Sequence, residues 1–303
     1  MTRFSVEPDR VDLPSGATAG ARRTWIKRDG RPIAALSQNA YRAYIYPLFT
    51  PSGVSVTAES PIDHPHHNSV TIGADHFDCL FVYDGHRTER GTYNFYVNET
   101  FQGRATGRIE AVSFDSDEID GDTLRIIQRL EWQGPIEWGA PERRVLAGET
   151  RTIDIRTTKS SNILDIRSRL EPTDWDIVIG PTRHAYFTVR MADGLRVVDG
   201  GKIVDADGNN SVQEINEGAA TWVTMSATGP HRREVGVTVA AHPSPLPTGW
   251  YAHEWGTVAI NPFLHQEQSI KRGEALELNV SVAAHDGPLP LDMLDSVYDV
   301  RDR

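Results

Sequence analysis

Aspartate–glycine pairs recur along this chain, and they constrain its fold more than any other sequence feature. They begin at residues 29, 84, 120, 193, 199, 207 and 286. Such pairs are typical of tight turns, because glycine accepts positive φ and the aspartate side chain hydrogen-bonds to nearby backbone amides. Frequent turns leave little room for long helices, so the sequence predicts strands joined by short connections.

Runs rich in apolar, β-branched and aromatic residues lie between these turns. They predict strands at residues 44–49, 77–83, 92–97, 107–114, 123–132, 145–157, 163–170, 185–189 and 277–283. Residues 152–157 and 163–168 alternate apolar and polar side chains, which indicates a β-hairpin with one wet face. The segment after His67 has room for one short helix. We therefore expect an all-β fold, a large antiparallel β-sandwich.

The length of 303 residues permits one large domain, since β-rich architectures often keep about 250 residues or more together. No Gly/Ser-rich or Pro-rich linker divides the chain, and the proline-rich stretch 242–247 fits a rigid loop. The sequence predicts a single domain over 1–303. Its N-terminal segment 1–20 should be peripheral, and its C-terminal tail 290–303 should pack only weakly.

The formal net charge is −11, from 31 basic and 42 acidic residues, and no basic run is present. This argues against nucleic-acid binding and favours small neutral or weakly charged ligands. No run of 18 apolar residues predicts a membrane span, and Met1 is not followed by a secretory apolar region. We expect a cytoplasmic protein without membrane contact, and homo-oligomers are allowed. Cys79, the single cysteine, should be a buried thiol.

Five of the eleven histidines fall between residues 64 and 86, with the densest group in Asp63-His64-Pro65-His66-His67. Pro65 favours an edge or a loop. In an extended segment, His64 and His66 would share one face and His67 the other. His66 and His67 are candidate acid–base groups, whereas Asp63, His64 and His66 are candidate ligands of a divalent metal. Structural hydrogen bonding is a third interpretation, and the glutamate that follows the H-x-H pair of cupins is absent.

Two further segments combine aromatic and titratable residues. In Gly249–Gly256, Trp255 is a candidate stacking platform for a sugar ring, His253 a substrate contact and Glu254 a proton relay; Asn261 follows as a possible substrate contact. Before the strand predicted at 185–189, Arg183 could hold an oxyanion and His184 could transfer a proton. Core packing of Trp255 and surface roles for Arg183 and His184 are the alternatives. Motifs of serine hydrolases, P-loop NTPases, dinucleotide-binding dehydrogenases and zincins are absent.

The histidine cluster and Trp255-Gly256-Thr257-Val258-Ala259-Ile260-Asn261-Pro262-Phe263 together resemble a bacterial family of PmoA-like proteins. The resemblance covers roughly residues 40–290, although Asn68 stands where an arginine often follows and Arg183-His184 where a lysine and an acidic residue are expected. The family's methane-oxygenase name does not describe this chain, because that enzyme is a helical membrane protein. What the resemblance implies is a galactose-mutarotase-like supersandwich and a place in sugar metabolism.

Our leading hypothesis is an enzyme that acts on a sugar or an oxidised keto sugar by proton transfer, as an epimerase, mutarotase or lyase. His66, His67, His184 and Glu254 would transfer protons, while Arg183, His253, Trp255 and Asn261 would bind the substrate. The alternatives are a metal-dependent oxidoreductase that uses the His64/His66 cluster and a non-catalytic carbohydrate-binding module. No cofactor is identified by the sequence, and a divalent metal ion is the one that the cluster suggests.

Overall fold

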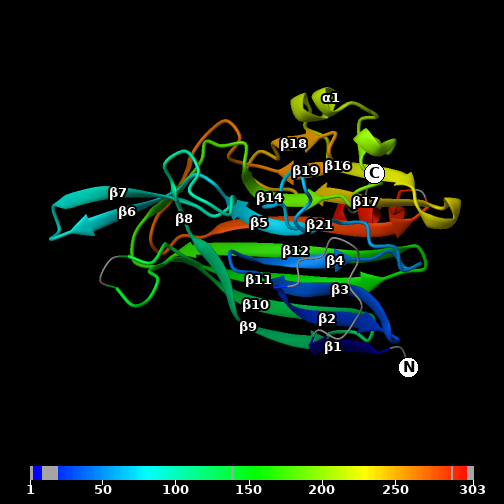
Figure 1. Cartoon of the computed structure of the whole chain (residues 1–303), viewed down its shortest axis with the longest axis horizontal. Helices are drawn as coiled ribbons and strands as arrows, with labels where there is room; N and C mark the ends of the chain where they lie inside the picture. The colour runs from blue at the N-terminus through cyan, green and yellow to red at the C-terminus, as the bar shows by residue number, and fades with distance from the viewer. Residues whose placement is uncertain (1–2, 9–19, 138–139, 288, 299–303) are drawn as a thin grey trace.

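The computed structural model describes residues 3–8, 20–137, 140–287 and 289–298, and two eight-stranded sheets dominate it (Figure 1). The first sheet has, in spatial order, β1 (Phe4–Pro8), β2 (Arg22–Arg28), β3 (Arg31–Gln38), β4 (Ala43–Leu48), β5 (Val70–Ala74), β14 (Ala185–Arg190), β19 (Thr257–Ile260) and β18 (Trp250–His253). The second has β15 (Lys202–Asp205), β16 (Trp222–Thr228), β17 (Glu234–Ala241), β21 (Leu276–Asp286), β12 (Ser161–Pro172), β11 (Val145–Thr157), β10 (Thr123–Gln133) and β9 (Arg108–Glu118). Neighbouring strands in both sheets are antiparallel.

A smaller sheet lies at one end of the sandwich, where the β6–β7 hairpin projects from the body (Figure 1). Its strands, in spatial order, are β20 (Gln268–Ile270), β13 (Ile177–Ile179), β6 (Phe77–Tyr83), β7 (Arg87–Asn94) and β8 (Ala105–Thr106). Helical structure in the described residues is confined to α1 (Val212–Glu217), α2 (Leu291–Tyr298) and the 3₁₀ turns Val197–Asp199 and Pro230–Arg232. The prediction of an all-β antiparallel sandwich is confirmed.

Alternation of apolar and polar residues directs one face of each large sheet inward. In the second sheet, strand pairing aligns Ile126, Ile153 and Ile166 in one row, and all three are buried. They belong to one continuous apolar cluster that includes Ile72 and Phe187 of the first sheet. Burial of such side chains contributes about 1.5–3 kcal/mol each, and it fixes the register, because a one-residue slip would expose the row.

Most of the predicted strands are present, and 77–83 and 145–157 match β6 and β11 at both ends. The predicted hairpin is formed by β11 and β12. Two predictions are wrong. Residues 92–97 lie only partly in a strand, since β7 ends at Asn94, and the segment after His67 forms β5 instead of a helix. Its apolar residues Val70 and Ile72 are buried between the sheets, where a paired strand satisfies their backbone.

The two chain ends pack more closely than predicted. β1 pairs with β2, and α2 inserts Met293 and Leu294 against Ile163 of the second sheet. The rest of the predicted terminal segments, at 1–2, 9–19 and 299–303, lies outside the described residues. The continuous core agrees with the single-domain prediction, which stays a prediction. Cys79 is fully buried, and burial raises the pKa of its thiol to about 12. No helix in the described part of the chain is long and apolar enough to cross a membrane.

Candidate active site

The outer face of the first sheet carries polar residues where β5, β14 and β19 lie side by side. Thr71 of β5 pairs with Thr188 of β14, and Arg190 of β14 pairs with Thr257 of β19. All four are buried, although their strand neighbours fill the apolar core on the opposite face. Buried polar groups on a sheet face require partners above them. The segments that cover this face are the histidine cluster and residues 95–104.

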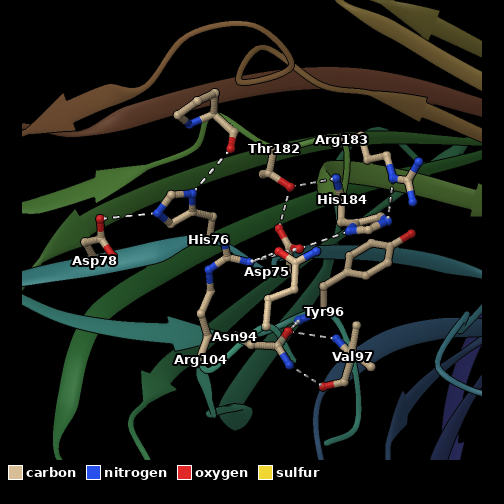
Figure 2. Close-up of polar contacts among 12 residues, drawn as sticks. Asp75, His76, Asp78, Asn94, Tyr96, Val97, Arg104, Thr182, Arg183 and His184 are labelled. Carbon is tan, nitrogen blue, oxygen red and sulfur yellow. Dashed lines mark hydrogen bonds and ion pairs between the residues drawn. The ribbon is translucent and has the colours of Figure 1, made fainter. Parts of the chain in front are cut away.

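At one end of the β5–β14 pair, Asp75 holds His184. The strand register places Ala74 opposite Ala185, so the next residues, Asp75 and His184, meet beyond the paired region. The backbone amide of Asp75 donates to the carbonyl of His184, and His184 Nδ1 lies 2.9 Å from Asp75 Oδ2 (Figure 2). The Thr182 hydroxyl donates to the other carboxylate oxygen. Asp75 is buried, whereas His184 is partly exposed.

The partners of His184 define where its proton lies. Arg183 Nε donates to His184 Nε2 at 3.1 Å, and a guanidinium can only donate. His184 Nε2 therefore accepts, and Nδ1 carries the proton donated to Asp75. Burial works to raise the pKa of Asp75, but hydrogen bonds from His184 and Thr182 outweigh it and lower that pKa. The result is a carboxylate-oriented imidazole whose second nitrogen has a lone pair, which is the arrangement of a general base.

Tyr96 connects this pair to the histidine cluster. The 95–97 segment crosses β5 at Gly73, where an added Cβ would lie 2.6 Å from the Phe95 carbonyl oxygen. Glycine is thus required for this close approach. The Tyr96 ring stacks on His184 with a centroid separation of 5.4 Å, and its hydroxyl lies 3.3 Å from His67 Nε2. Figure 2 shows Tyr96 beside His184 and held from below by Asn94, whose carboxamide oxygen accepts from the Tyr96 amide.

The histidine cluster is a tight turn, in agreement with the edge or loop expected from Pro65, and the extended case considered for it does not occur. The amide of His67 donates to the carbonyl of His64 at 2.9 Å. This fold brings all three rings together: His64 and His67 stack at 4.7 Å, and His66 meets His67 edge to face at 4.7 Å. Pro65 sits at the corner, where its fixed φ and missing amide hydrogen suit a turn.

His67 is buried and both of its nitrogens are occupied. Nδ1 lies 3.4 Å from Arg190 Nη1 and 3.3 Å from the Thr257 hydroxyl, while Nε2 contacts the Tyr96 hydroxyl. Burial, together with neighbouring positive groups, lowers the pKa of His67 to about 2. The predicted catalytic role of His67 loses its geometric basis, because a buried and fully bonded imidazole has no surface for a substrate. Its position suits support of Tyr96 and Arg190.

His66, like His64, is partly exposed. Its ring is half-buried and packs edge to face on Tyr96 at 5.6 Å, and its side chain makes no hydrogen bond with the described residues. Burial and the nearby Arg42 lower the pKa of His66 to about 4. His66 and His184 both contact the Tyr96 ring, His66 edge to face and His184 by stacking, so the two imidazoles are near one another. Both imidazoles can exchange protons with a molecule bound over Tyr96.

The predicted metal ligands Asp63, His64 and His66 lie near one another, but protein partners already occupy Asp63 and His64. Arg190 Nη2 donates to both oxygens of Asp63 at 2.8 Å, and His64 lies flat against His67. Burial works to raise the pKa of Asp63, but hydrogen bonds from Arg190 and His64 lower it well below its usual range. Within the described residues, no group of three or more His, Cys, Asp or Glu side chains is arranged to hold a metal ion. Metal binding by Asp63, His64 and His66 stays a prediction from the sequence.

The β18–β19 turn completes the site, with roles that differ from those predicted. Trp255 stacks on two protein rings, His64 at 4.8 Å and His253, so its predicted sugar platform is covered. Trp255 Nε1 and His253 Nδ1 are buried polar atoms without a hydrogen-bond partner. Glu254 is exposed. Asn261 is fully buried and donates to the Thr182 carbonyl at 2.6 Å, which makes it a support of the Thr182–His184 segment.

Segments from three parts of the sequence thus converge, near residues 65, 183 and 254. His64 stacks on Trp255, and Arg183 acts electrostatically on His253. The sequence reasoning missed Asp75, Tyr96, Arg190 and Arg42. Arg42 is buried and donates to the His66 carbonyl and the Asn68 carboxamide. The sequence contains no signal for these four residues, which lie in runs that read as strands or loops.

Comparison with known sequences assigns the chain to a family but to no activity. The model of a family described as "Family of unknown function (DUF6807)" matches residues 23–299. No curated protein matches the sequence. Nothing among these findings supports the PmoA-like name that the sequence resemblance suggested.

Solved structures with a similar arrangement of strands are distant in sequence. The chain aligns with an alpha-galactosidase from Lactobacillus brevis at 7% identity and a TM-score of 0.43, covering 87% of this chain and 38% of the galactosidase. A candidate aldose 1-epimerase from Escherichia coli K12 aligns at 8% identity and a TM-score of 0.38, covering 95% and 100%. A galactose mutarotase related enzyme from Lactobacillus acidophilus aligns at 7% identity and a TM-score of 0.35, covering 93% of this chain and 97% of that enzyme. At these TM-scores, the fold assignment rests on the strand pairing described above.

Proposed function

The chain belongs to DUF6807, a family of unknown function, and we propose from its site that it is an enzyme transferring a proton on a sugar or an oxidised sugar derivative. The reaction classes that fit are epimerisation, mutarotation and β-elimination. One observation carries the proposal: the buried Asp75 orients the partly exposed His184 so that Nε2 presents a lone pair at the site.

His184 has the features of a general base. Its Nδ1 proton is held by a carboxylate, which fixes the ring and stabilises the imidazolium that forms when Nε2 takes a proton. A positioned base of this kind contributes about 10²- to 10⁴-fold to a rate. The stacked Tyr96 ring holds the imidazole from the side.

His66, which also packs on Tyr96, supplies a second proton-transfer group. A neutral imidazole can accept a proton from one face of a substrate while His184 serves the opposite face, which is what inversion at carbon requires. Arg183, next to His184, is placed to stabilise negative charge that develops on oxygen. In mutarotation, His184 and His66 would exchange protons with the anomeric hydroxyl and the ring oxygen.

The test uses a panel of aldoses, keto sugars and sugar acids. Proton NMR monitors the incorporation of deuterium from the solvent into each sugar, and the rate of anomer exchange is measured for the same sugars. We expect His184→Asn to lower the rate on any active sugar by about 10²- to 10⁴-fold. His76→Asn is the matched control, because His76 also contacts a carboxylate, Asp78 at 3.5 Å, but lies outside the stacked group (Figure 2). We expect it to retain the wild-type rate.

Two results would overturn the proposal. One is a wild-type protein that binds sugars and exchanges no proton or anomer of any of them, which would leave a carbohydrate-binding module. The other is a rate that His184→Asn and His76→Asn lower equally, since the effect would then come from a general disturbance of the 75–78 turn.

A further inference from the structure

Arg183 is the cation at the site that the protein leaves open. Its side chain is exposed, and its one hydrogen bond to a described residue uses Nε to reach His184 Nε2. No carboxylate of the described residues lies within ion-pair distance of its guanidinium, and neither terminal nitrogen donates a hydrogen bond to a described residue. A planar guanidinium with free terminal nitrogens is suited to bind a carboxylate through two parallel hydrogen bonds.

The other arginines around the site are held by protein oxygens. These contacts join Arg190 to Asp63, Arg196 to Asp199, Arg104 to Asp75, and Arg42 to the His66 carbonyl and the carboxamides of Asn68 and Asn98. Each of these has a structural reason to be where it is. Arg183 has none beyond its neighbour His184, which points to a ligand.

Burial disfavours a positive charge on three imidazoles of the site, those of His66, His67 and His253. Burial lowers the pKa of His66 to about 4 and of His67 to about 2, and it also lowers the pKa of His253. The open positive charge is therefore concentrated on Arg183, in a chain whose net charge is −11. A local cation on an acidic protein selects for one negative group at one position, and it does not attract polyanions in general.

We propose that the substrate is a sugar acid and that Arg183 binds its carboxylate next to the His184 base. This inference rests on the proposed function and deepens it by naming the substrate class. It also explains the contact between the two side chains. Without substrate, Arg183 caps the His184 lone pair; a carboxylate is a stronger acceptor, since it is negatively charged and can take two parallel hydrogen bonds from a guanidinium. Binding of the acid would draw the guanidinium away and release the base.

The chemistry of a sugar acid gives a reason for the position of Arg183 next to His184. A proton on the carbon next to a carboxylate is weakly acidic, because its removal places a second negative charge on the carboxylate. When His184 Nε2 takes this proton, the C–H electron pair moves into the carboxylate to form an enediolate, whose charge Arg183 offsets. Return of a proton from solvent to the opposite face gives the epimer, and the His184 imidazolium then releases the proton that it took. Loss of the oxygen substituent on the next carbon, as the alcohol or water, gives the elimination product.

The experiment compares acidic and neutral sugars of the same configuration. Glucuronate is paired with glucose and galacturonate with galactose, and binding to the full chain is measured by NMR titration at low and at high salt. We expect each acid to bind at least tenfold more tightly than its neutral partner, with the preference reduced by salt. Arg183→Met should abolish the preference, and Arg272→Met, at an exposed arginine elsewhere, should preserve it. Thermal unfolding of each variant confirms that it is folded.

The outcomes separate this inference from the proposed function. Failure of both acids to bind, equal binding of acids and neutral sugars, or a preference that survives Arg183→Met overturns the inference. Exchange of protons on neutral sugars that depends on His184 would then leave the proposed function standing. Conversely, an acid preference that requires Arg183, without deuterium incorporation next to the carboxylate, supports carboxylate recognition and removes the catalytic role of His184.

Discussion

The two ends of the β5–β14 strand pair both bring histidine and aspartate together, but the main partner of the aspartate differs between them. At the end that contains Asp63, Arg190 binds the carboxylate and His67 is buried with both nitrogens occupied. At the end that contains Asp75, His184 has one nitrogen on the carboxylate and the other beside the exposed Arg183.

This difference teaches that a high density of titratable residues in the sequence does not locate the reactive group. The cluster at 63–67 is the most conspicuous motif, and two of its three histidines are held among protein rings. Its main effect is to cover the polar face of the sheet and to support Tyr96. The reactive position depends on what remains accessible after these contacts have formed.

The largest expected effect is on turnover, from a substitution at the end of the strand pair that contains Asp75. Asp75→Asn should lower the turnover of the sugar identified by deuterium exchange by about 10²-fold or more, because an amide no longer stabilises the imidazolium of His184. Asp63→Asn should change the same rate by less than about threefold, since Asp63 contacts no group in the proton path. The turnover rates of the two variants, measured side by side, test this prediction. Equal losses of rate would contradict it and would place the chemistry at the histidine cluster 63–67.

A second prediction concerns the stability of the other end. Arg190→Met should lower the free energy of unfolding by about 3 kcal/mol, because Asp63 loses a buried partner and His67 Nδ1 loses a donor. Arg196→Met removes a more exposed arginine with aspartate partners and should cost less than about 1 kcal/mol. Urea unfolding measures both. Similar losses would show that the Arg190 contacts are not a structural centre.

The pH dependence of stability tests whether His67 is held as a buried neutral group. The pKa of His67 falls from 6.5 to about 2 on folding, so between these values the unfolded chain binds a proton that the folded chain does not. Stability contributed by this group is present above pH 6.5 and is lost as the pH falls, by about 2 kcal/mol at pH 5. His67→Gln should remove this part of the acid sensitivity, whereas His265→Gln, at an exposed histidine, should follow the wild type. Unfolding at pH 7 and pH 5 provides the measurement, and parallel losses in all three proteins would contradict it.

The smallest effect tests the connection between the two ends. Gly73→Ala places a methyl group against the Phe95 carbonyl oxygen and should displace the Tyr96 segment, at a cost of about 1–2 kcal/mol. Gly148→Ala is the control, because an added Cβ there meets nothing within 4 Å. It should be neutral or slightly stabilising. If both variants unfold at the same denaturant concentration, Tyr96 does not need this close approach.

Much of the fold could be predicted from the sequence because strands leave local signals. The alternation in 152–157 and 163–168 arises from the two-residue period of a strand, and Asp-Gly pairs mark turns through their own backbone preferences. These are short-range effects. The segment after His67 was misjudged because five buried residues, Val70–Ala74, have no polar alternation to distinguish a central strand from a helix.

The site could be predicted only as separate pieces. The residue types near 65, 183 and 254 indicated proton transfer, and the sequence by itself named His66, His184 and Arg183 as candidates. It could not assign them different roles, because accessibility and hydrogen-bond partners depend on residues far away in the chain. His67 is removed from the surface by Arg190, which is 123 residues away, and His184 gains its carboxylate from Asp75, 109 residues away.

The sequence therefore determined the strand content, the turns and the chemical types available for a site. The tertiary structure alone decided which histidine keeps an open nitrogen, which arginine lacks a protein partner and which aspartate orients a base. The physical reason is that strand propensity and turn geometry act over a few residues, whereas burial and hydrogen-bond pairing are set by the register of β5 against β14 and by the segment that crosses Gly73.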